Sequence, residues 1–219
     1  MLNHQQLQLI QQQLQPYKAQ LVAVTKKQSI ETILELYEAG QMVFGENKVQ
    51  ELLPKYEQLP KDIQWHLIGH LQTNKVKQIA GFIQCIHSVD SLRLLEEINE
   101  QAKRHGRTIR CLLQVHIAAE QTKFGFTPNE LLQLLEQTSF AHLPHIAIVG
   151  LMGMATFTDN AQQVRNEFRH LKQLFVQCKN TFFASQDSFC ELSMGMSDDY
   201  TIALEEGSTI IRVGSLLYR

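Results

Sequence analysis

The sequence predicts an α/β fold, a single-domain TIM-type (β/α)8 barrel with an additional helix before its first strand. Short apolar runs alternate with amphipathic stretches along the 219-residue chain, and eight such runs occur. Several runs are continuously apolar, as expected for parallel strands with both faces covered. Eight strands separated by helices form a closed barrel or an open doubly wound sheet. The count of eight and the absence of a G-x-G-x-x-G motif favour the barrel.

The expected strands, in chain order, are Leu21–Thr25, Met42–Gly45, Gln64–Gly69, Gln84–Val89, Ile109–Ile117, His145–Met152, Glu191–Met194 and Thr209–Val213. A first helix is expected over about residues 2–15, with Leu7, Ile10 and Leu14 on one face. The sequence stops at Arg219, shortly after the eighth strand, so no eighth outer helix is expected. We therefore predict that the N-terminal helix covers that part of the barrel wall.

Helix signals occupy the segments between the strands. Ser29 is expected to cap a helix that Gly40 ends. Thr127 and Glu130, with Pro128 at the first helical position, form a capping box. No linker or repeat interrupts the pattern, so residues 1–219 are predicted to form a single domain.

Composition excludes several classes of protein. The apolar content of 44% is ordinary for a globular protein, and the formal net charge of −2 predicts no nucleic-acid partner. No apolar run approaches the length of about 18 residues that spans a bilayer, and the Gln-rich start is unlike a signal peptide. The four cysteines are scattered without a C-x-x-C pair, so we expect reduced thiols and a cytoplasmic location. No stripe typical of an obligate interface is evident, and a monomer is the default expectation.

The active site of such a barrel lies where the strands end, at the carboxyl-terminal face. Lys26 ends the first apolar strand there, and burial would lower the pKa of its amine, as a Schiff-base lysine requires. A solvated lysine is the simpler interpretation of that residue taken alone. Lys27 is the candidate for the solvated position.

The loop after the seventh strand and the end of the eighth form a candidate phosphate site. Ser197 is a natural N-cap and Gly195 permits a tight backbone path, while Gly214 and Ser215 follow the eighth strand. Loops after strands seven and eight recurrently bind phosphate in this barrel. Asp198 and Asp199 bring negative charge to the same place and are expected to point to solvent. A plain capped helix is the alternative.

Other polar residues follow the second, third and fifth strands. His66 and His70 are four residues apart on a strand and are not expected to share a zinc ion. His66 is expected inside the barrel, held by hydrogen bonds. Lys123 and Gly125 could shape the rim, although a solvated loop lysine is an equal alternative.

Five motifs in register resemble the YggS/PROSC family of pyridoxal phosphate homeostasis proteins, which is related to the N-terminal barrel of alanine racemase. They are AVTK at residues 23–26, FGENKVQE at 44–51, WHLIGHLQTNK at 65–75, LSMGMSDD at 192–199 and GSTIIRVG at 207–214.

The resemblance implies that pyridoxal 5′-phosphate (PLP) is the cofactor and that Lys26 holds it as a Schiff base. It also implies that Asn47 lies near the cofactor ring and that Arg212 faces the pyridine nitrogen. The cofactor-binding residues predicted in this way are Lys26, Asn47, His66, Met196, Ser197, Arg212, Gly214 and Ser215. Of these, Ser197, Gly214 and Ser215 are assigned to the phosphate. No metal ligand and no catalytic residue is predicted.

The chain departs from the family pattern at several places. Thr25 replaces a serine, Lys27-Gln28 replaces a stretch that ends in proline, His70 stands where proline is common and His116 where asparagine is common. The ending GSLLYR at 214–219 replaces a G-T-A-I-F-G pattern. Ser215 nevertheless keeps a hydroxyl for the phosphate.

The resemblance implies a PLP-binding protein that buffers the cofactor and delivers it to PLP-dependent apo-enzymes, and not an enzyme. The alternative is a PLP-dependent amino-acid racemase, which needs acid/base groups on both faces of the cofactor. Alanine racemase-like enzymes take the second group from a tyrosine of another domain. Of the five tyrosines of this chain, Tyr200 and Tyr218 lie near the phosphate loops, and neither is an evident second base. An unrelated phosphate-sugar enzyme is a third, weaker alternative.

Overall fold

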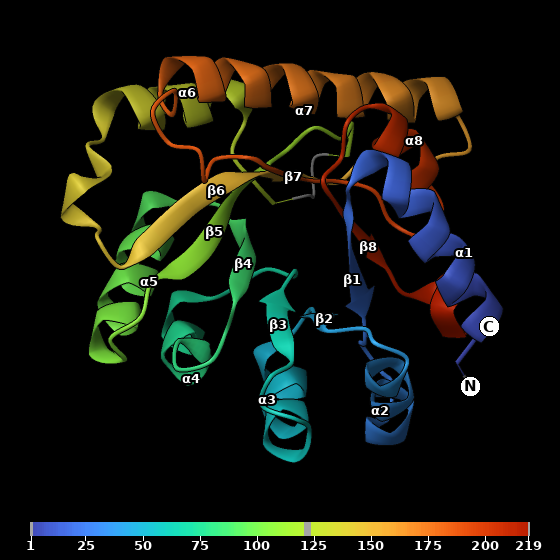
Figure 1. Cartoon of the computed structure of the whole chain (residues 1–219). Helices are drawn as coiled ribbons and strands as arrows, with labels where there is room; N and C mark the ends of the chain where they lie inside the picture. Colours follow the sequence, from blue (N-terminus) through green and yellow to red (C-terminus); the bar gives the residue numbers. More distant parts are fainter. Residues whose placement is uncertain (1, 121–123, 219) are drawn as a thin grey trace.

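The strands of the computed structural model follow one another around a closed barrel in the order β1 to β8, and every neighbouring pair is parallel (Figure 1). The structure describes residues 2–120 and 124–218. The strands are β1 (Gln20–Val24), β2 (Val43–Glu46), β3 (Gln64–Leu67), β4 (Cys85–Val89), β5 (Ile109–Val115), β6 (Ile146–Gly153), β7 (Glu191–Ser193) and β8 (Ile210–Val213). The predicted barrel is therefore confirmed.

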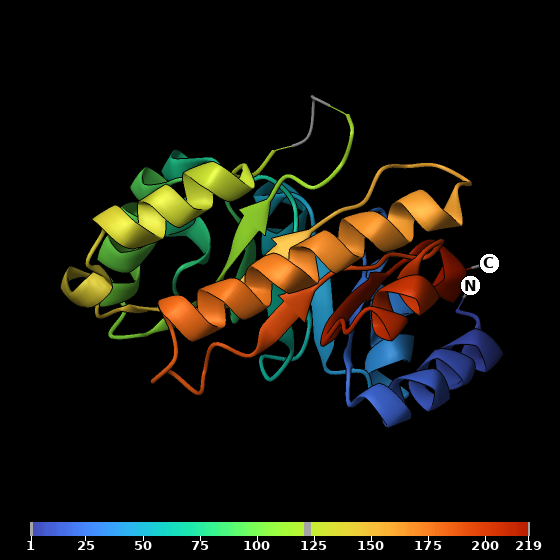
Figure 2. The same ribbon diagram turned by 90° about the horizontal axis from the view of Figure 1, so that it is seen from above.

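Helices form the outer layer around these strands (Figures 1 and 2). The α-helices are α1 (His4–Leu14), α2 (Ile30–Glu38), α3 (Val49–Gln58), α4 (Val76–Ile79), α5 (Leu92–Arg104), α6 (Pro128–Gln137), α7 (Ala161–Thr181) and α8 (Tyr200–Glu205). Short 3-10 helices are η1 (Gln15–Tyr17), η2 (Thr73–Lys75), η3 (Phe140–His142) and η4 (Ser215–Tyr218). None of the described helices is long and apolar enough to cross a membrane.

The predicted caps start two of these helices. Ser29 precedes α2, and its hydroxyl accepts a hydrogen bond from the backbone amide of Thr32 at 3.3 Å. Thr127 and Glu130 form the complete capping box of α6, with each side chain bonded to the other residue's backbone amide. Each cap satisfies donors that the first helical turn leaves free.

The N-terminal helix covers the wall where the barrel closes. Leu7, Ile10 and Leu14 of α1 are buried in the main core, and α1 lies beside β1 and the end of the chain (Figure 1). The backbone amide of Asn3 donates to the carbonyl of Leu217 in η4 at 2.8 Å. Among the described residues η4 follows β8, and α1 covers this part of the barrel wall as predicted.

Two apolar clusters separate the outside of the barrel from its inside. The larger lies between the strands and the helices. The smaller consists of strand residues that fill the barrel itself: Val22, Val43, Cys85, Leu112, Val149, Met152 and Ile210. Because side chains alternate along a strand, His87 and Arg212, two positions after Cys85 and Ile210, also face the barrel interior. All four cysteines are free thiols, and Cys190 is the exposed one.

Candidate functional site

The loops after β7 and β8 meet at the carboxyl-terminal mouth of the barrel. The backbone amide of Gly214 donates to Ser197 Oγ at 3.3 Å. A Cβ atom on residue 214 would lie 3.2 Å from the Cβ of Val24, so glycine lets this loop approach β1 closely. The predicted phosphate residues are therefore brought together by the fold, and the loop that carries them adjoins the end of β1.

A cavity of about 340 Å³ opens at this point. Lys26, Gly214 and Ser215 line it, together with Val24, Lys27, Gln28 and Tyr218. Its volume lies at the lower end of the range for small-molecule sites. Its described lining holds two lysines and no carboxylate, which suits an anionic ligand.

Lys26 follows β1 as predicted, but its side chain is exposed and not buried. The reason is a turn: the amide of Gln28 donates to the carbonyl of Thr25 at 2.9 Å, and Lys27 has a φ of +62°. This turn carries Lys26 out of the sheet to the cavity mouth. Of the two interpretations of Lys26, the buried one is wrong and the solvated one agrees with the structure, and the place of Lys26 at the end of β1 is confirmed.

Ser197 does not cap the helix after β7, contrary to the prediction. The N-cap of α8 is Asp199, and Asp199 Oδ1 accepts from the backbone amide of Met196 at 2.5 Å. Asp199 is half-buried and not directed to solvent as predicted, and burial raises the pKa of its carboxyl, against the opposing effects of the Met196 amide and Arg212. Asp198 is exposed as predicted. The Ser197 hydroxyl instead accepts the hydrogen bond from the backbone amide of Gly214.

The backbone around Gly195 takes the tight path that was predicted. Gly195 has a φ of +93°, and a Cβ there would lie 2.5 Å from the Cβ of Ala203 in α8. Met196, by contrast, is 37% exposed and lines a neighbouring cavity of about 560 Å³ with Phe157, Asp198 and Asp199, among others. Neither Met196 nor Ser197 lines the cavity of Lys26, and Ser197 is connected to that cavity through its bond with Gly214.

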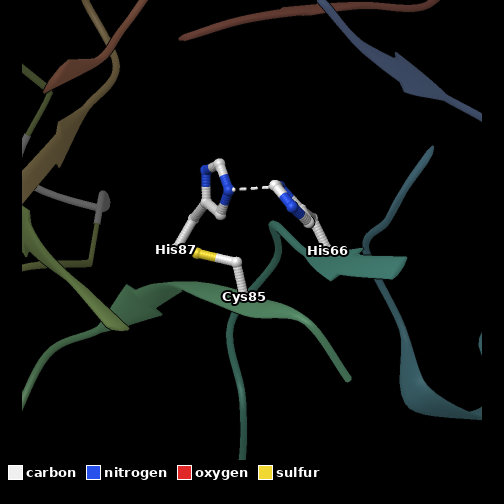
Figure 3. A group of neighbouring side chains, drawn as sticks. All are labelled: His66, Cys85 and His87. Atoms are coloured by element: carbon white, nitrogen blue, oxygen red, sulfur yellow. Dashed lines mark hydrogen bonds between the residues drawn. The ribbon is translucent and has the colours of Figure 1, made fainter. Parts of the chain in front are cut away.

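Arg212 lies inside the barrel and begins a chain of hydrogen bonds. Its Nη1 donates to Ser193 Oγ at 2.5 Å, and its Nη2 donates to the carbonyl of Gly153 at 3.0 Å. Ser193 Oγ is 3.0 Å from Nδ1 of His87, and Nε2 of His87 is 2.9 Å from Nδ1 of His66 (Figure 3). Since β4 and β7 are not neighbours in the sheet, the bond between His87 and Ser193 crosses the barrel interior.

Burial dominates the protonation of this chain. It lowers the pKa of His66 to about 3, with a smaller contribution from Arg110, and lowers the pKa of His87 well below its usual value. Burial also lowers the pKa of Arg212 to about 10, which leaves the guanidinium charged at neutral pH. The chain therefore joins one cation to two neutral imidazoles. His66 is an interior histidine held by a hydrogen bond, as predicted.

The spacing of His66, Cys85 and His87 would also suit a metal ion, because their ligand atoms lie within 4.8 Å of one another (Figure 3). The chemistry of the surroundings does not favour one. The facing ring nitrogens of the two histidines bond each other, and the charge of Arg110 lowers the pKa of both. Burial raises the pKa of the Cys85 thiol to about 12. His70 is not part of the group and pairs with Asp90 at 3.2 Å.

A second polar network lies behind the Lys26 turn, in the wall between β2 and α3. Lys55 Nζ donates to Glu46 Oε1 at 2.5 Å and to the carbonyl of Thr25 at 2.7 Å. The hydroxyl of Thr25 donates to the same Glu46 oxygen at 2.6 Å. All three side chains are buried. Lys55 was not among the predicted site residues, although its place three residues after Leu52 and six after Val49 on the buried stripe of α3 was a usable signal.

The remaining predicted residues lie around the rim. Asn47 directly follows β2, and its backbone lies close to Gly69. A Cβ atom on residue 69 would be 2.3 Å from the carbonyl oxygen of Asn47. Gly125 precedes Phe126, whose amide bonds the carbonyl of Gln114 on β5 at 2.8 Å. Lys123 lies outside the described residues.

The chain matches the family model for the alanine racemase N-terminal domain over residues 4–219. It is 40% identical over 201 residues to the pyridoxal phosphate homeostasis protein of Aquifex aeolicus, which covers 91% of this chain and 86% of that protein. The structure of PipY from Synechococcus elongatus with PLP bound superposes with a TM-score of 0.88 at 36% identity, covering 98% of this chain and 99% of that one.

A more distant likeness concerns the fold alone. Alanine racemase of Clostridium difficile superposes with a TM-score of 0.70 at 13% identity, and the match covers 99% of this chain but 56% of that one. Identity of 35–40% along most of the chain is found instead with the homeostasis proteins of several organisms. The chain belongs to the alanine racemase N-terminal domain family and, within it, to the pyridoxal phosphate homeostasis proteins.

Proposed function

We propose that this protein binds PLP through a Schiff base with Lys26 and takes part in PLP homeostasis, holding the cofactor and delivering it to PLP-dependent apo-enzymes. The observation that carries the proposal is the cavity at the barrel mouth, where Lys26 and the loop of Gly214 and Ser215 face the same space. A primary amine and a phosphate-type loop on one cavity are the two attachments that PLP requires. The PLP-bound relative and the names of the related proteins support this assignment.

The donor set fits the phosphate group. Ser197 Oγ accepts from Gly214, so its own hydrogen is available to an anion, and Ser215 adds a second hydroxyl. Lys27 lines the same cavity and adds positive charge. The two carboxylates of the loop after β7, Asp198 and Asp199, line a different cavity and are not part of the lining around Lys26.

Arg212 suits the pyridine nitrogen because a guanidinium donates hydrogen bonds and accepts none. Bound PLP supplies an electrophilic carbonyl carbon and an electron-withdrawing ring. A charged Arg212 at the ring nitrogen keeps that nitrogen unprotonated and weakens the electron sink. Holding the cofactor is therefore favoured over broad carbanion chemistry.

The tyrosines near the site do not supply the second base of a racemase. The hydroxyl of Tyr200 donates to Gln13 Oε1 of α1 at 2.7 Å, on the outer wall of the barrel. Burial, reinforced by Glu46, raises the pKa of Tyr218 well above its usual value, so its phenolate is not accessible near neutral pH. We therefore infer that the protein binds PLP and does not racemise amino acids. We further propose that residues 1–219 form one PLP-binding domain and that the protein is a monomer in the cytoplasm.

The test uses purified protein loaded with PLP. We expect the visible absorbance of a Schiff base, and borohydride reduction followed by peptide mass spectrometry should place the adduct on Lys26. Lys26→Ala should abolish the band and the adduct, whereas Lys27→Ala, its neighbour on the same cavity, should keep both. An adduct that persists in Lys26→Ala on any other residue contradicts the assignment.

The racemase alternative has its own measurement. Exchange of the α-proton of amino acids in deuterated water should stay at the rate of free PLP when the loaded protein is added. Rapid exchange that disappears in Lys26→Ala would replace the binding proposal with an enzyme.

A further inference from the structure

Arg212 is a buried cation whose hydrogen-bond partners among the described residues are neutral. It is 3% exposed, and its bonds go to the Ser193 hydroxyl and the Gly153 carbonyl. A bonded carboxylate would neutralise the guanidinium, whereas neutral acceptors satisfy its hydrogens and leave the charge available. Burial of the guanidinium without a bonded counter-charge costs desolvation energy, which contact with a bound ligand would offset.

The hydrogens of the interior chain can be assigned from the end at Arg212. A guanidinium only donates, so Ser193 Oγ accepts from it. Ser193 then has one hydrogen to give, and Nδ1 of His87 is 3.0 Å away. That hydrogen bond makes His87 the Nε2–H tautomer, which donates in turn to Nδ1 of His66 at 2.9 Å. His66 must then carry its own hydrogen on Nε2.

The opposite direction is electrostatically worse. If Nδ1–H of His87 donated to Ser193, the serine oxygen would accept two bonds, and its own hydrogen would have no acceptor among the described residues of a fully buried site. The imidazole N–H dipole would also point its positive end toward the cation of Arg212. Both effects favour a chain whose hydrogens point away from Arg212.

We propose that Ser193, His87 and His66 are positioning residues that hold the guanidinium of Arg212 in place. They do so through a chain of hydrogen bonds in which every donated hydrogen points away from Arg212. This inference rests on the proposed function, which assigns Arg212 to the ring nitrogen of PLP. It adds how the arginine is held there. β3, β4 and β7 each contribute one side chain to the hydrogen-bond chain, which crosses the barrel interior.

Few other charges face this group. The negative charge of Asp199, the N-cap of α8, raises the pKa of Arg212 against the larger effect of burial. Arg110 acts on both histidines, and it is paired with Glu191 at 2.6 Å. Neither residue is hydrogen-bonded to the chain, so the position of Arg212 depends on Ser193 and the Gly153 carbonyl.

The first test needs no cofactor. Nitrogen-15 NMR of the imidazoles in the unliganded protein should show His66 and His87 neutral and both protonated on Nε2 at about pH 6. A hydrogen on Nδ1 of His87 would reverse the chain and overturn the proposal. This result is independent of PLP, so it separates the chain from the proposed function, which fails if the wild-type protein shows no PLP band.

The second test follows the pH titration of the visible band of bound PLP. With Ser193→Ala or His87→Leu, Arg212 is held less firmly, and its charge should oppose protonation of the cofactor less. The midpoint should rise by about one pH unit, which is a tenfold change in proton affinity. PLP should dissociate about tenfold more readily, as expected for one lost hydrogen bond to a charged group.

Two controls separate positioning from general damage to the barrel. His87→Asn places an oxygen near the position of Nδ1 and should restore the wild-type midpoint, even where Ser193→Ala does not fold. Cys85→Ala removes a buried side chain beside both histidines, and should lower stability while the midpoint stays unchanged (Figure 3). An equal shift in Cys85→Ala, or an unchanged midpoint in His87→Leu, would contradict the proposal.

Discussion

Two buried polar networks lie close to the candidate site, and they differ in both place and charge. The wall network joins Thr25, Glu46 and Lys55 between β2 and α3, on the outside of the barrel. The interior chain runs from Arg212 through Ser193 and two histidines, inside the barrel. The first pairs opposite charges and the second leaves one charge unpaired.

This difference indicates that the wall network stabilises the fold, whereas the interior chain presents Arg212 to a ligand. In the wall network, Lys55 cancels the charge of Glu46 and also binds the carbonyl of Thr25, so it ties α3 to the turn that carries Lys26. A cancelled charge has little to offer a ligand. The interior chain keeps its cation available at the price of burial, which suits a contact with a cofactor.

The wall network is also less completely satisfied. Glu46 Oε2 and the hydroxyl of Tyr218 are buried without a hydrogen-bond partner among the described residues. Tyr218 senses Glu46, which raises its pKa in addition to burial. Burying such an atom without a partner costs desolvation energy that no hydrogen bond offsets. The wall is therefore where loss of a single partner should be most damaging.

The largest effect is expected from Lys55→Met. It leaves the Glu46 carboxylate buried without its counter-charge, and the free energy of unfolding should fall by about 3–5 kcal/mol. Urea unfolding measures it. Adding Glu46→Gln removes the second charge and should recover more than half of the loss.

A surface pair provides the matched comparison for this prediction. Arg104 and Glu100 form an exposed ion pair on α5 at 3.3 Å, and Arg104→Ala should change the free energy of unfolding by no more than about 0.5 kcal/mol. If Lys55→Met proved equally mild, the wall network would not be what secures the turn.

The interior chain predicts a specific dependence of stability on pH. An unfolded histidine titrates near pH 6.5, whereas the pKa of His66 in the folded protein is about 3 and that of His87 is also well lowered. Between these values the unfolded chain binds protons that the folded chain does not. The free energy of unfolding should therefore fall on acidification, by about 2 kcal/mol per histidine between about pH 7.5 and pH 5.

Urea unfolding across this pH range is the measurement, and a variant isolates the contribution of one residue. His66→Gln should reduce the pH-dependent loss by about half, whereas His4→Gln, at an exposed position in α1, should leave it unchanged. A stability that is flat across this range would mean that the two histidines are not buried in the neutral form.

The sequence predicted the elements of the fold because their signals are local. Alternating apolar runs and caps such as Ser29 depend on residues close in the chain, and the motifs that end strands located Lys26 and Gly214. The cap of α8 was misassigned because Ser197 and Asp199 are both good N-caps two positions apart. Which one is used depends on the contact of Ser197 with the loop after β8, and that contact is not local.

The two networks illustrate the same limit. His87 meets His66 only because β3 and β4 are neighbours in a fixed register, and it meets Ser193 only because the barrel closes. Neither relation can be read from spacing along the chain. The sequence also left open whether Lys26 is buried or solvated, since its exposure depends on a turn in which Lys27, without the help of glycine, takes a positive φ.

That turn gives the smallest prediction, which concerns the strain beside the wall network. Lys27 has a φ of +62°, a conformation that costs a side-chain-bearing residue about 1–2 kcal/mol, and glycine would recover part of this against its greater freedom when unfolded. Lys27→Gly should raise the free energy of unfolding by about 0.5 kcal/mol in urea titrations. Lys18→Gly, at φ +52° after η1 and away from the cavity, should stabilise by a similar amount. If Lys18→Gly stabilises and Lys27→Gly does not, the Lys27 side chain makes a compensating contribution at the cavity, and the turn is held by more than the bonds of Thr25.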